Sequence, residues 1–174
     1  MKMNREYANE LEKTDFELFQ DFNNYLKLLD LGQCPYEHHS DASGITRDGR
    51  HVDAELKFRN QVLLDDLKTI SGSTKNGKTY TASTIFIEGH KIADMLLDYV
   101  CLNREQLYVN FLNDDVIILF NVAKLKHRPN KVVKKIYSEL YQSIELAKRQ
   151  ELDMRDAWIY KKINNEWVMV KRAE

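Results

Sequence analysis

The sequence predicts a mixed α/β fold, in which helices pack against one central sheet. Residues 51–59 alternate strictly between polar and apolar side chains, which is the period of a half-buried strand. Apolar residues recur at three- and four-residue steps over 89–102 and again over 130–148, which is the period of an amphipathic helix. Asp48-Gly49 is a strong turn signal just before the alternating segment.

The same patterns order the whole chain. We expect a helix over 5–30 stopped by Gly32, strands at 36–42 and 51–59, a turn or short helix at 60–69, a loop at 71–78, a strand at 80–87, a helix at 89–102, strands at 107–112 and 116–122, a helix at 130–148, and a closing hairpin of 158–161 with 166–170. No repeat, linker or low-complexity stretch interrupts this series. A single domain over 1–174 is therefore expected.

The composition is that of an ordinary globular protein. The chain has 174 residues, 43% of them apolar and 30% charged, which is enough to bury a sizeable core. It contains no apolar run of about 20 residues that could span a membrane, and its first residues resemble a polar helix rather than a signal peptide. A cytoplasmic location is expected. Cys34 and Cys101 have no zinc or disulfide spacing, and Cys101 is interpreted as a small core residue.

The alternating segment carries the candidate chemistry. Its apolar residues Val52, Ala54, Leu56 and Phe58 are expected to face the core, and its polar residues His51, Asp53, Glu55, Lys57 and Arg59 the opposite side. Glu55 and Lys57 then project side by side, a suitable platform for a divalent metal and a neighbouring water. The alternative is that these charges only keep a half-exposed strand soluble.

A second carboxylate lies upstream. If strands 36–42 and 51–59 are antiparallel neighbours, Asp41 comes close to Glu55 on the polar face. Two adjacent carboxylates repel each other and raise each other's pKa unless a cation lies between them. Hard oxygen ligands with open coordination positions favour Mg²⁺ or Mn²⁺ over zinc.

Asp41, a short hairpin and then Glu55-Leu56-Lys57 resemble the signature of the PD-(D/E)xK nuclease superfamily, which includes many restriction endonucleases, junction resolvases and phage nucleases. The residue before the first Asp is often Pro in that family and is Ser40 here. The resemblance covers about 14–122, where the expected order is the restriction-endonuclease-like α-β-β-β-α-β core. The C-terminal helix and hairpin at 123–174 lie outside it.

The resemblance implies a metal-dependent nuclease that hydrolyses phosphodiester bonds, with DNA as the favoured substrate. Asp41, Glu55 and the backbone carbonyl of Leu56 would hold Mg²⁺ or Mn²⁺, which neutralises transition-state charge and lowers the pKa of its bound water. Lys57 would orient the water and stabilise charge, and a role as the base is left open. Many members add a glutamate from the first helix, for which Glu17 is the choice.

Glu17 has an alternative interpretation, because Thr14-Asp15-Phe16-Glu17 is also a capping box; Glu12 and Glu10 are its substitutes in the site. Weaker candidates are Asp53 on the polar face, His39 two residues from Asp41, and His90 at the start of the second helix. Asp53 could instead be solvated at the start of its strand, and the pair His38-His39 is more often a surface or packing feature. Glu88, just before that helix, is interpreted as a cap.

Basic residues supply candidate contacts to phosphate. Lys91 lies at a helix N-terminus, which attracts anions, and the acid-free run from Lys124 to Lys135 adds Lys124, Lys126, Arg128 and Lys131. The alternative for this run is a solvated loop and helix start. The competing function is a non-catalytic factor that binds nucleic acid or protein on a nuclease-like fold. A homodimer would suit cutting of both strands, although no interface signature is visible.

Overall fold

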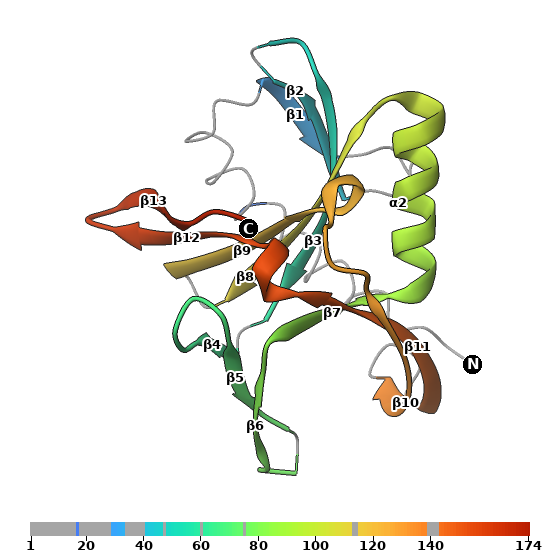
Figure 1. Ribbon diagram of the computed structural model, residues 1–174, viewed down its shortest axis with the longest axis vertical. Helices are drawn as coiled ribbons and strands as arrows, with labels where there is room; N and C mark the ends of the chain where they lie inside the picture. The colour runs from blue at the N-terminus through green and yellow to red at the C-terminus, as the bar shows by residue number, and fades with distance from the viewer. Residues whose placement is uncertain are drawn as a thin grey trace.

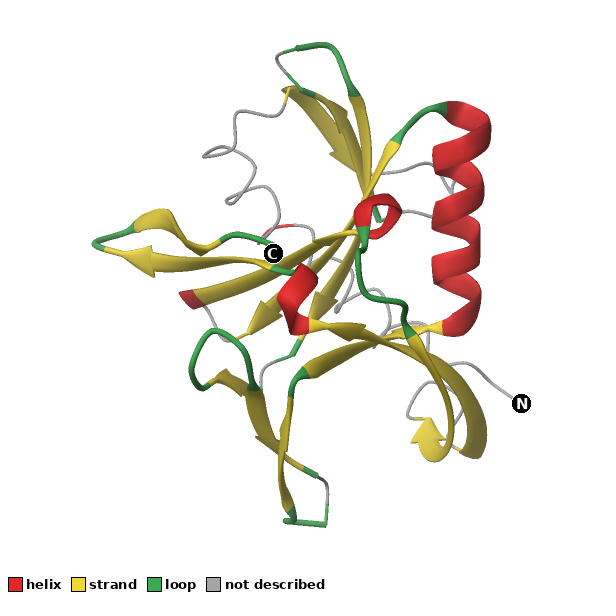
Figure 2. Ribbon diagram, viewed as in Figure 1, coloured by secondary structure: helices red, strands yellow, loops and turns green. Residues whose placement is uncertain are grey.

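The computed structural model describes residues 17, 29–33, 41–46, 48–59, 61–74, 76–112, 115–138 and 143–174 (Figures 1 and 2). Their elements are β1 (Leu29–Gln33), β2 (Ala42–Ile45), β3 (His51–Phe58), β4 (Val62–Leu64), β5 (Ile70–Ser73), β6 (Thr79–Ala82), β7 (Thr84–Glu88), α2 (Gly89–Leu102), β8 (Glu105–Leu112), β9 (Val116–Asn121), η2 (Val122–Lys124), β10 (Asn130–Ser138), β11 (Ser143–Asp153), η3 (Met154–Asp156), β12 (Trp158–Ile163) and β13 (Glu166–Lys171). The class is mixed α/β, and rich in strands.

The main sheet has the strand order β1-β2-β3-β8-β9-β12-β13. Its neighbouring strands are antiparallel except for β3 and β8, which are parallel. Between β3 and β8 the chain forms β4 to β7 and then α2, which runs alongside the sheet (Figure 1). Parallel neighbours need such a crossover, because the chain must return to the same end of the sheet.

Two smaller sheets complete the described structure. One has the order β10-β11-β7 and the other β4-β5-β6. Strand β7 therefore leads from a small sheet directly into α2. Its Ile85 and Ile87 point into the core beside Leu152 of β11, whereas Phe86 and Glu88 alternate to the other face.

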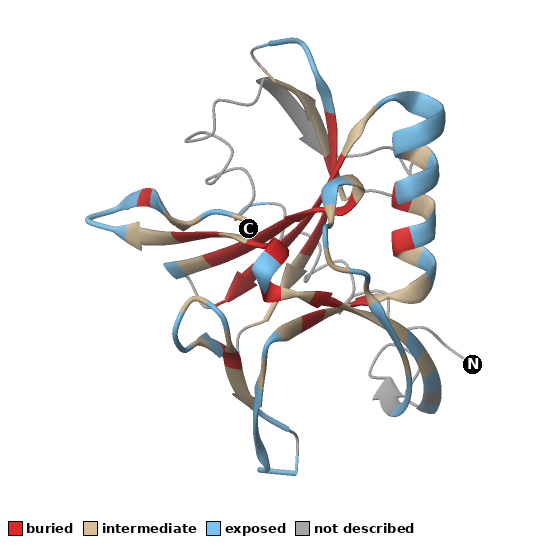
Figure 3. Cartoon of the chain, viewed as in Figure 1, coloured by how far each residue is buried: buried red, intermediate tan, exposed pale blue. Residues whose placement is uncertain are grey.

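The core occupies both faces of the main sheet. Val52, Ala54 and Leu56 belong to one buried cluster, as the alternation predicts. On the opposite face, however, Asp53 and Glu55 are also buried. Figure 3 shows the buried residues gathered in the main sheet and on the side of α2 that faces it. The prediction of a half-exposed strand is therefore wrong for the centre of β3, because this part of its polar face lies under α2.

Several predicted elements are confirmed. The hairpin before residue 59 is present, although its first strand is Ala42–Ile45 instead of 36–42, and 34–40 lie outside the described residues. Helix α2 matches 89–102, and the β8–β9 and β12–β13 pairs match the two predicted hairpins. Asn164 and Asn165 have φ values of 52° and 63°. Asparagine tolerates this left-handed conformation better than most residues, which explains the turn.

The predicted helix at 130–148 is wrong. Residues 130–138 and 143–153 instead form the antiparallel strands β10 and β11, and β11 also pairs with β7. Residues 130–138 pair with 143–151, and the end of β11, from Arg149 to Asp153, adds β7 as a third strand. Adjacent β-branched residues, Val132 and Val133, also favour a strand.

Other boundaries shift as well. The predicted strand at 80–87 is divided at Ser83 into β6 and β7, which belong to different sheets, and 60–78 contains β4 and β5. Residues 29–33 are a strand where the first helix was expected to end. Cys101 is exposed, so it is not a core residue. Among the described residues, no helix has both the length and the apolar character needed to cross a membrane.

Candidate functional site

Asp41 lies at the junction of β2 and β3. Its backbone N–H donates to the Ala54 carbonyl (2.9 Å), and its Oδ2 accepts a hydrogen bond from the Leu56 N–H (2.7 Å). The carboxylate therefore extends the β2–β3 ladder beside Glu55. Because the N–H and C=O of one strand residue point to the same edge, the Leu56 carbonyl also faces the side on which Asp41 lies.

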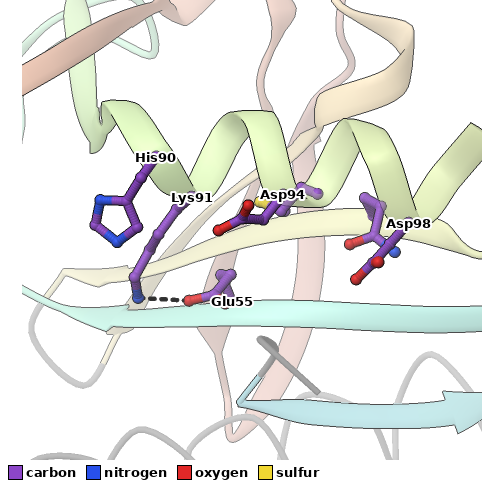
Figure 4. Close-up of a pocket in the computed structure, with 7 residues that line it drawn as sticks. Glu55, His90, Lys91, Asp94 and Asp98 are labelled. Carbon is purple, nitrogen blue, oxygen red and sulfur yellow. Dashed lines mark hydrogen bonds and ion pairs between the residues drawn. The ribbon is translucent and has the colours of Figure 1, made fainter. Parts of the chain in front are cut away.

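Glu55 is almost completely buried, with 2% of its side chain exposed. Its Oε2 lies 2.6 Å from the Nζ of Lys91, which reaches down from the first turn of α2 (Figure 4). Burial, together with the nearby Asp41 and Glu88 carboxylates, raises the pKa of Glu55 to about 7, against the lowering effect of Lys91. Near neutral pH this carboxyl is therefore protonated in part of the molecules.

Lys91 is the counterion of the buried carboxylates. Burial by itself would lower its pKa, but Glu55, Asp41 and Glu88 outweigh burial and raise it. Its ammonium therefore stays charged and points inward to Glu55. The predicted contact with a phosphate stays a prediction, and such a contact would have to compete with this ion pair.

Lys57 lies two residues beyond Glu55 on the same face of β3. Its Nζ is 4.0 Å from Oε1 of Glu88, at the end of β7. Burial raises the pKa of Glu88, but Lys57, Lys91 and Arg59 outweigh this effect, and the net shift is downward. Glu88 is the N-cap residue of α2 by position, as the sequence predicts, but its side chain makes no capping bond to the helix. We name Asp41, Glu55, Lys57 and Lys91 the carboxylate site, with Glu88 at its border.

A pocket of about 100 Å³ opens beside Glu55. It is lined by Glu55, His90, Lys91, Asp94, Met95, Asp98 and Gln106. Asp94 and Asp98 lie one turn apart on α2 (Figure 4). Such a volume admits water or an ion but no nucleotide. In the described part of the chain, no three His, Cys, Asp or Glu residues are arranged to hold a metal by themselves.

Asp53 has partners of its own. Its Oδ2 accepts from Gln106 Nε2 at 3.2 Å and lies 3.5 Å from Arg104 Nη1. The residue is 2% exposed, so the interpretation as a solvated residue at a strand start is wrong. This arrangement directs Asp53 to the beginning of β8, and the contacts made by its carboxylate are structural.

The basic run is spread over η2 and β10. Lys124 pairs with Glu105 at 2.9 Å, and Glu105 lies opposite Val52 at the beginning of β3. Lys57 lies near the other end of the same strand. Lys126, Arg128 and Lys131 are exposed. The structure therefore does not bring Lys124 to the carboxylate site, and phosphate contact by the three exposed residues stays a prediction.

Glu17 is helical and exposed. Its predicted place in the site stays a prediction, and the substitutes Glu12 and Glu10, like His39 and Ser40, lie outside the described residues. His90 lines the small pocket and is itself exposed. The sequence interpretation missed Glu88 as a partner of Lys57. The sequence did offer one signal for Glu88, which is its position between an apolar strand and the second helix.

Comparison with known proteins does not identify a family for this chain. No protein-family model, curated protein or solved structure matches it. The resemblance to the PD-(D/E)xK superfamily therefore rests on the residues of the motif in the sequence.

Proposed function

We propose that the protein is a metal-dependent nuclease that hydrolyses phosphodiester bonds in DNA. The observation that carries this proposal is the convergence of Asp41 and Glu55 where β2 meets β3, with Lys57 projecting from the same face of β3. Two carboxylates and an ammonium on neighbouring rigid strands are suited to stabilising charge at a phosphate.

The order of elements supports the proposal. Strands β1, β2 and β3 form an antiparallel series, and β8 lies parallel to β3 after a crossover that contains β4 to β7 and then α2. The main-sheet strands and α2 are compatible with a restriction-endonuclease-like core in which β4 to β7 are inserted before the helix, although the strand expected at 80–87 lies outside the main sheet. The proposed active residues lie at its centre, where the charged face of β3 meets the beginning of α2.

The donors fit a hard divalent cation. Two carboxylates and the Leu56 carbonyl offer oxygen ligands, the type that Mg²⁺ and Mn²⁺ prefer. Bound there, Mg²⁺ or Mn²⁺ would supply Lewis-acid stabilisation and a more acidic water. The Lys91 ammonium now compensates the charge of Glu55, so metal binding requires Lys91 to share Glu55 or to turn away.

The protein's own lysine side chains would supply the other roles, which are to orient the water and to offset negative charge. Lys57, partly exposed beside Glu88, is placed to orient water and to offset negative charge on the phosphate. Lys91, displaced from Glu55, would offer a second ammonium from the first turn of α2. Both lysines then act through charge, and the proton of the attacking water can pass to solvent or to a neighbouring carboxylate.

The test uses purified protein with supercoiled plasmid and with single-stranded DNA, in Mg²⁺, Mn²⁺ or EDTA. Asp41→Asn, Glu55→Gln and Lys57→Ala are compared with Glu166→Gln, an exposed carboxyl on β13. We expect cleavage only with metal, lowered about 10²-fold or more in the three site variants and unchanged in Glu166→Gln. Cleavage that persists in the site variants would place the activity elsewhere or in a contaminant.

One observation favours the alternative of a non-catalytic binding factor. Glu55 is almost fully buried and already paired with Lys91, an arrangement that can serve stability alone. This alternative predicts DNA binding in EDTA with no cleavage in any metal. It also predicts no thermal stabilisation by Mg²⁺, whereas the nuclease predicts a stabilisation that disappears in Asp41→Ala.

A further inference from the structure

A larger pocket, of about 460 Å³, lies beside β7 on the side away from α2. It is bounded by the β5–β6 hairpin, β7 and the β10–β11 pair, which meet around β7 in Figure 1. The residues that matter here are Arg59, Tyr80, Thr84, Phe86, Lys134 and Arg149. We name this the arginine pocket.

Two guanidinium groups share one aromatic ring in this pocket. The guanidinium carbon of Arg59 is 4.3 Å from the centroid of Phe86, and that of Arg149 is 3.8 Å from it. Stacking on an aromatic ring favours each cation separately. Two like charges on the same ring nevertheless repel each other, so the arrangement is strained electrostatically unless an anion joins it.

Arg59 is held in place by three hydrogen bonds. Its Nε donates to Asn110 Oδ1 (2.8 Å), and its Nη2 donates to the Phe86 carbonyl (2.8 Å) and to the Tyr108 hydroxyl (2.9 Å). These bonds fix its guanidinium against β8 and β7. Arg59 is thus a rigid part of the pocket wall.

Arg149 is different. In the described part of the chain it stacks on Phe86, and no carboxylate lies within 4.0 Å of its guanidinium. Glu151, the nearest acidic residue on its own strand face, is paired with Lys134 at 3.7 Å. Burial lowers the pKa of Arg149 and Arg59 adds to this effect, whereas Glu88, Tyr108 and Glu151 act in the opposite direction; the net shift is downward. The pocket therefore holds a partly buried cation whose hydrogen-bond donors are available to a ligand.

The lining suits a nucleotide. A guanidinium offers a planar pair of donors that matches two phosphate oxygens. Tyr80 supplies aromatic surface, and the hydroxyls of Thr74, Thr81 and Thr84 add polar groups. The volume is in the range of small-molecule sites. One unpaired nucleotide fits these dimensions, whereas a base pair within a duplex would be too large to enter.

The pocket adjoins the carboxylate site. Lys57 and Arg59 are two residues apart at the end of β3, and Glu88 and Phe86 are two residues apart on one face of β7. Two strand residues span about 7 Å. Glu88 also faces Arg149 across the β7–β11 register. A strand of nucleic acid held in the pocket would thus continue toward Lys57.

We propose that the arginine pocket binds one unpaired nucleotide of the substrate strand, with its phosphate on Arg149, and so presents the next phosphodiester to the carboxylate site. This inference rests on the proposed nuclease function and adds to it a preference for single-stranded or frayed DNA. Arg149 acts as a binding residue, and Arg59 and Phe86 hold its surroundings in place.

The test is binding of a fluorescein-labelled ten-nucleotide oligothymidylate in EDTA, measured by anisotropy at several salt concentrations. Arg149→Gln is compared with Arg172→Gln, an exposed arginine on the C-terminal segment. We expect Arg149→Gln to weaken binding about 10-fold or more, as loss of a charge-assisted contact does, and to reduce the salt slope by about 0.7. Arg149→Lys keeps the positive charge but loses the planar pair of N–H donors, so it is expected to recover only part of the affinity.

Three results would overturn the proposal: equal affinity of Arg149→Gln and the wild type, an equal loss in Arg172→Gln, or tighter binding of the matching duplex than of the single strand. Thymidine monophosphate is the second probe. If it binds as tightly as the oligonucleotide, the pocket serves free nucleotides and the proposal fails. Circular dichroism melting checks that each variant folds.

Binding is measured in EDTA, without any metal. A failure of the pocket proposal can therefore be distinguished from a failure of the nuclease proposal. Arg149-dependent binding without cleavage in any metal would keep the pocket as a nucleotide site and remove the enzymatic proposal. Metal-dependent cleavage of single strands with an unchanged kcat/KM in Arg149→Gln would keep the enzyme and remove the pocket.

Discussion

The carboxylate site and the arginine pocket flank the end of β7, yet they differ in how their buried charges are compensated. In the carboxylate site, Glu55 is 2% exposed and lies 2.6 Å from the Lys91 ammonium, so its charge is balanced inside the protein. In the arginine pocket, Arg149 and Arg59 crowd one ring, and the nearest carboxylate on the same strand as Arg149 is engaged with Lys134.

The difference indicates which groups are available to a ligand. The two members of a buried ion pair attract each other strongly. Only a competing cation can therefore displace the ammonium from the carboxylate. A partly buried cation whose hydrogen-bond donors are available gains from any suitable anion. The two regions thus suit the two ligands, a metal and a phosphate, that the proposed nuclease would have to hold together.

The largest expected effect is on the steady-state kinetics, where substitutions in the two regions should change different constants. Glu55→Gln should lower kcat on single-stranded DNA about 10²-fold or more, because it removes stabilisation of the transition state. Arg149→Gln should act mainly on KM, raising it about 10-fold, because its contact is made in the ground state as well. Steady-state kinetics at saturating Mg²⁺ measure both values. A fall in kcat alone for Arg149→Gln would erase the distinction.

The next effect is pH dependence of stability in EDTA. Folding raises the pKa of Glu55 from 4.5 to about 7, so the folded state holds this proton more tightly than the unfolded chain. The free energy of unfolding should therefore fall as pH rises from 4.5 to 7, by up to about 3 kcal/mol from this group, and then level off. The arginines stay protonated throughout this range and contribute nothing to it.

Urea unfolding at pH 5 and pH 8 measures this effect, with Glu55→Gln as the reference. The variant lacks the titrating carboxyl, so its stability should change less between the two pH values than that of the wild type. Identical pH dependence of the two proteins would show that Glu55 has no raised pKa.

A smaller effect concerns Lys91. At pH 8, where Glu55 is ionised, Lys91→Met should cost about 2 kcal/mol of unfolding free energy, because it leaves a buried carboxylate without its partner. At pH 5, where Glu55 holds a proton, the cost should fall below about 1 kcal/mol. Lys57→Met is the matched control. Its 4.0 Å pair with Glu88 is partly exposed and should contribute under about 0.5 kcal/mol.

The same unfolding experiment decides whether Lys91 competes with the metal. Without its ammonium, Mg²⁺ should stabilise Lys91→Met more than it stabilises the wild type at pH 8. An equal cost at both pH values, combined with an unchanged effect of Mg²⁺, would show that Lys91 only packs against the sheet.

Much of the framework could be predicted from local patterns. The alternation in β3, the helical period of α2 and the Asn164-Asn165 turn each reflect forces between residues close in sequence. Asp41 and Glu55 could be paired because a short hairpin brings its two strands together. These predictions depend on few assumptions about the rest of the molecule.

The errors arose where the pairing of strands decides. Residues 130–148 have a helical period, but 130–138 and 143–151 pair as an antiparallel hairpin, and the end of β11 (149–153) also pairs with β7, more than fifty residues away in the sequence. Period alone does not reveal these partners. Glu88 was interpreted as a cap because its position before α2 is known from sequence, whereas its proximity to Lys57 depends on β7 passing beside β3.

The sequence by itself therefore determined the motif of Asp41, Glu55 and Lys57 and the elements that carry it. The tertiary structure alone decided that Glu55 lies buried under α2 with Lys91 as its counterion, and that Arg59 and Arg149 meet on Phe86. The physical reason is that periodicity and turn chemistry act along the chain, whereas burial and charge pairing depend on which segments come together in space.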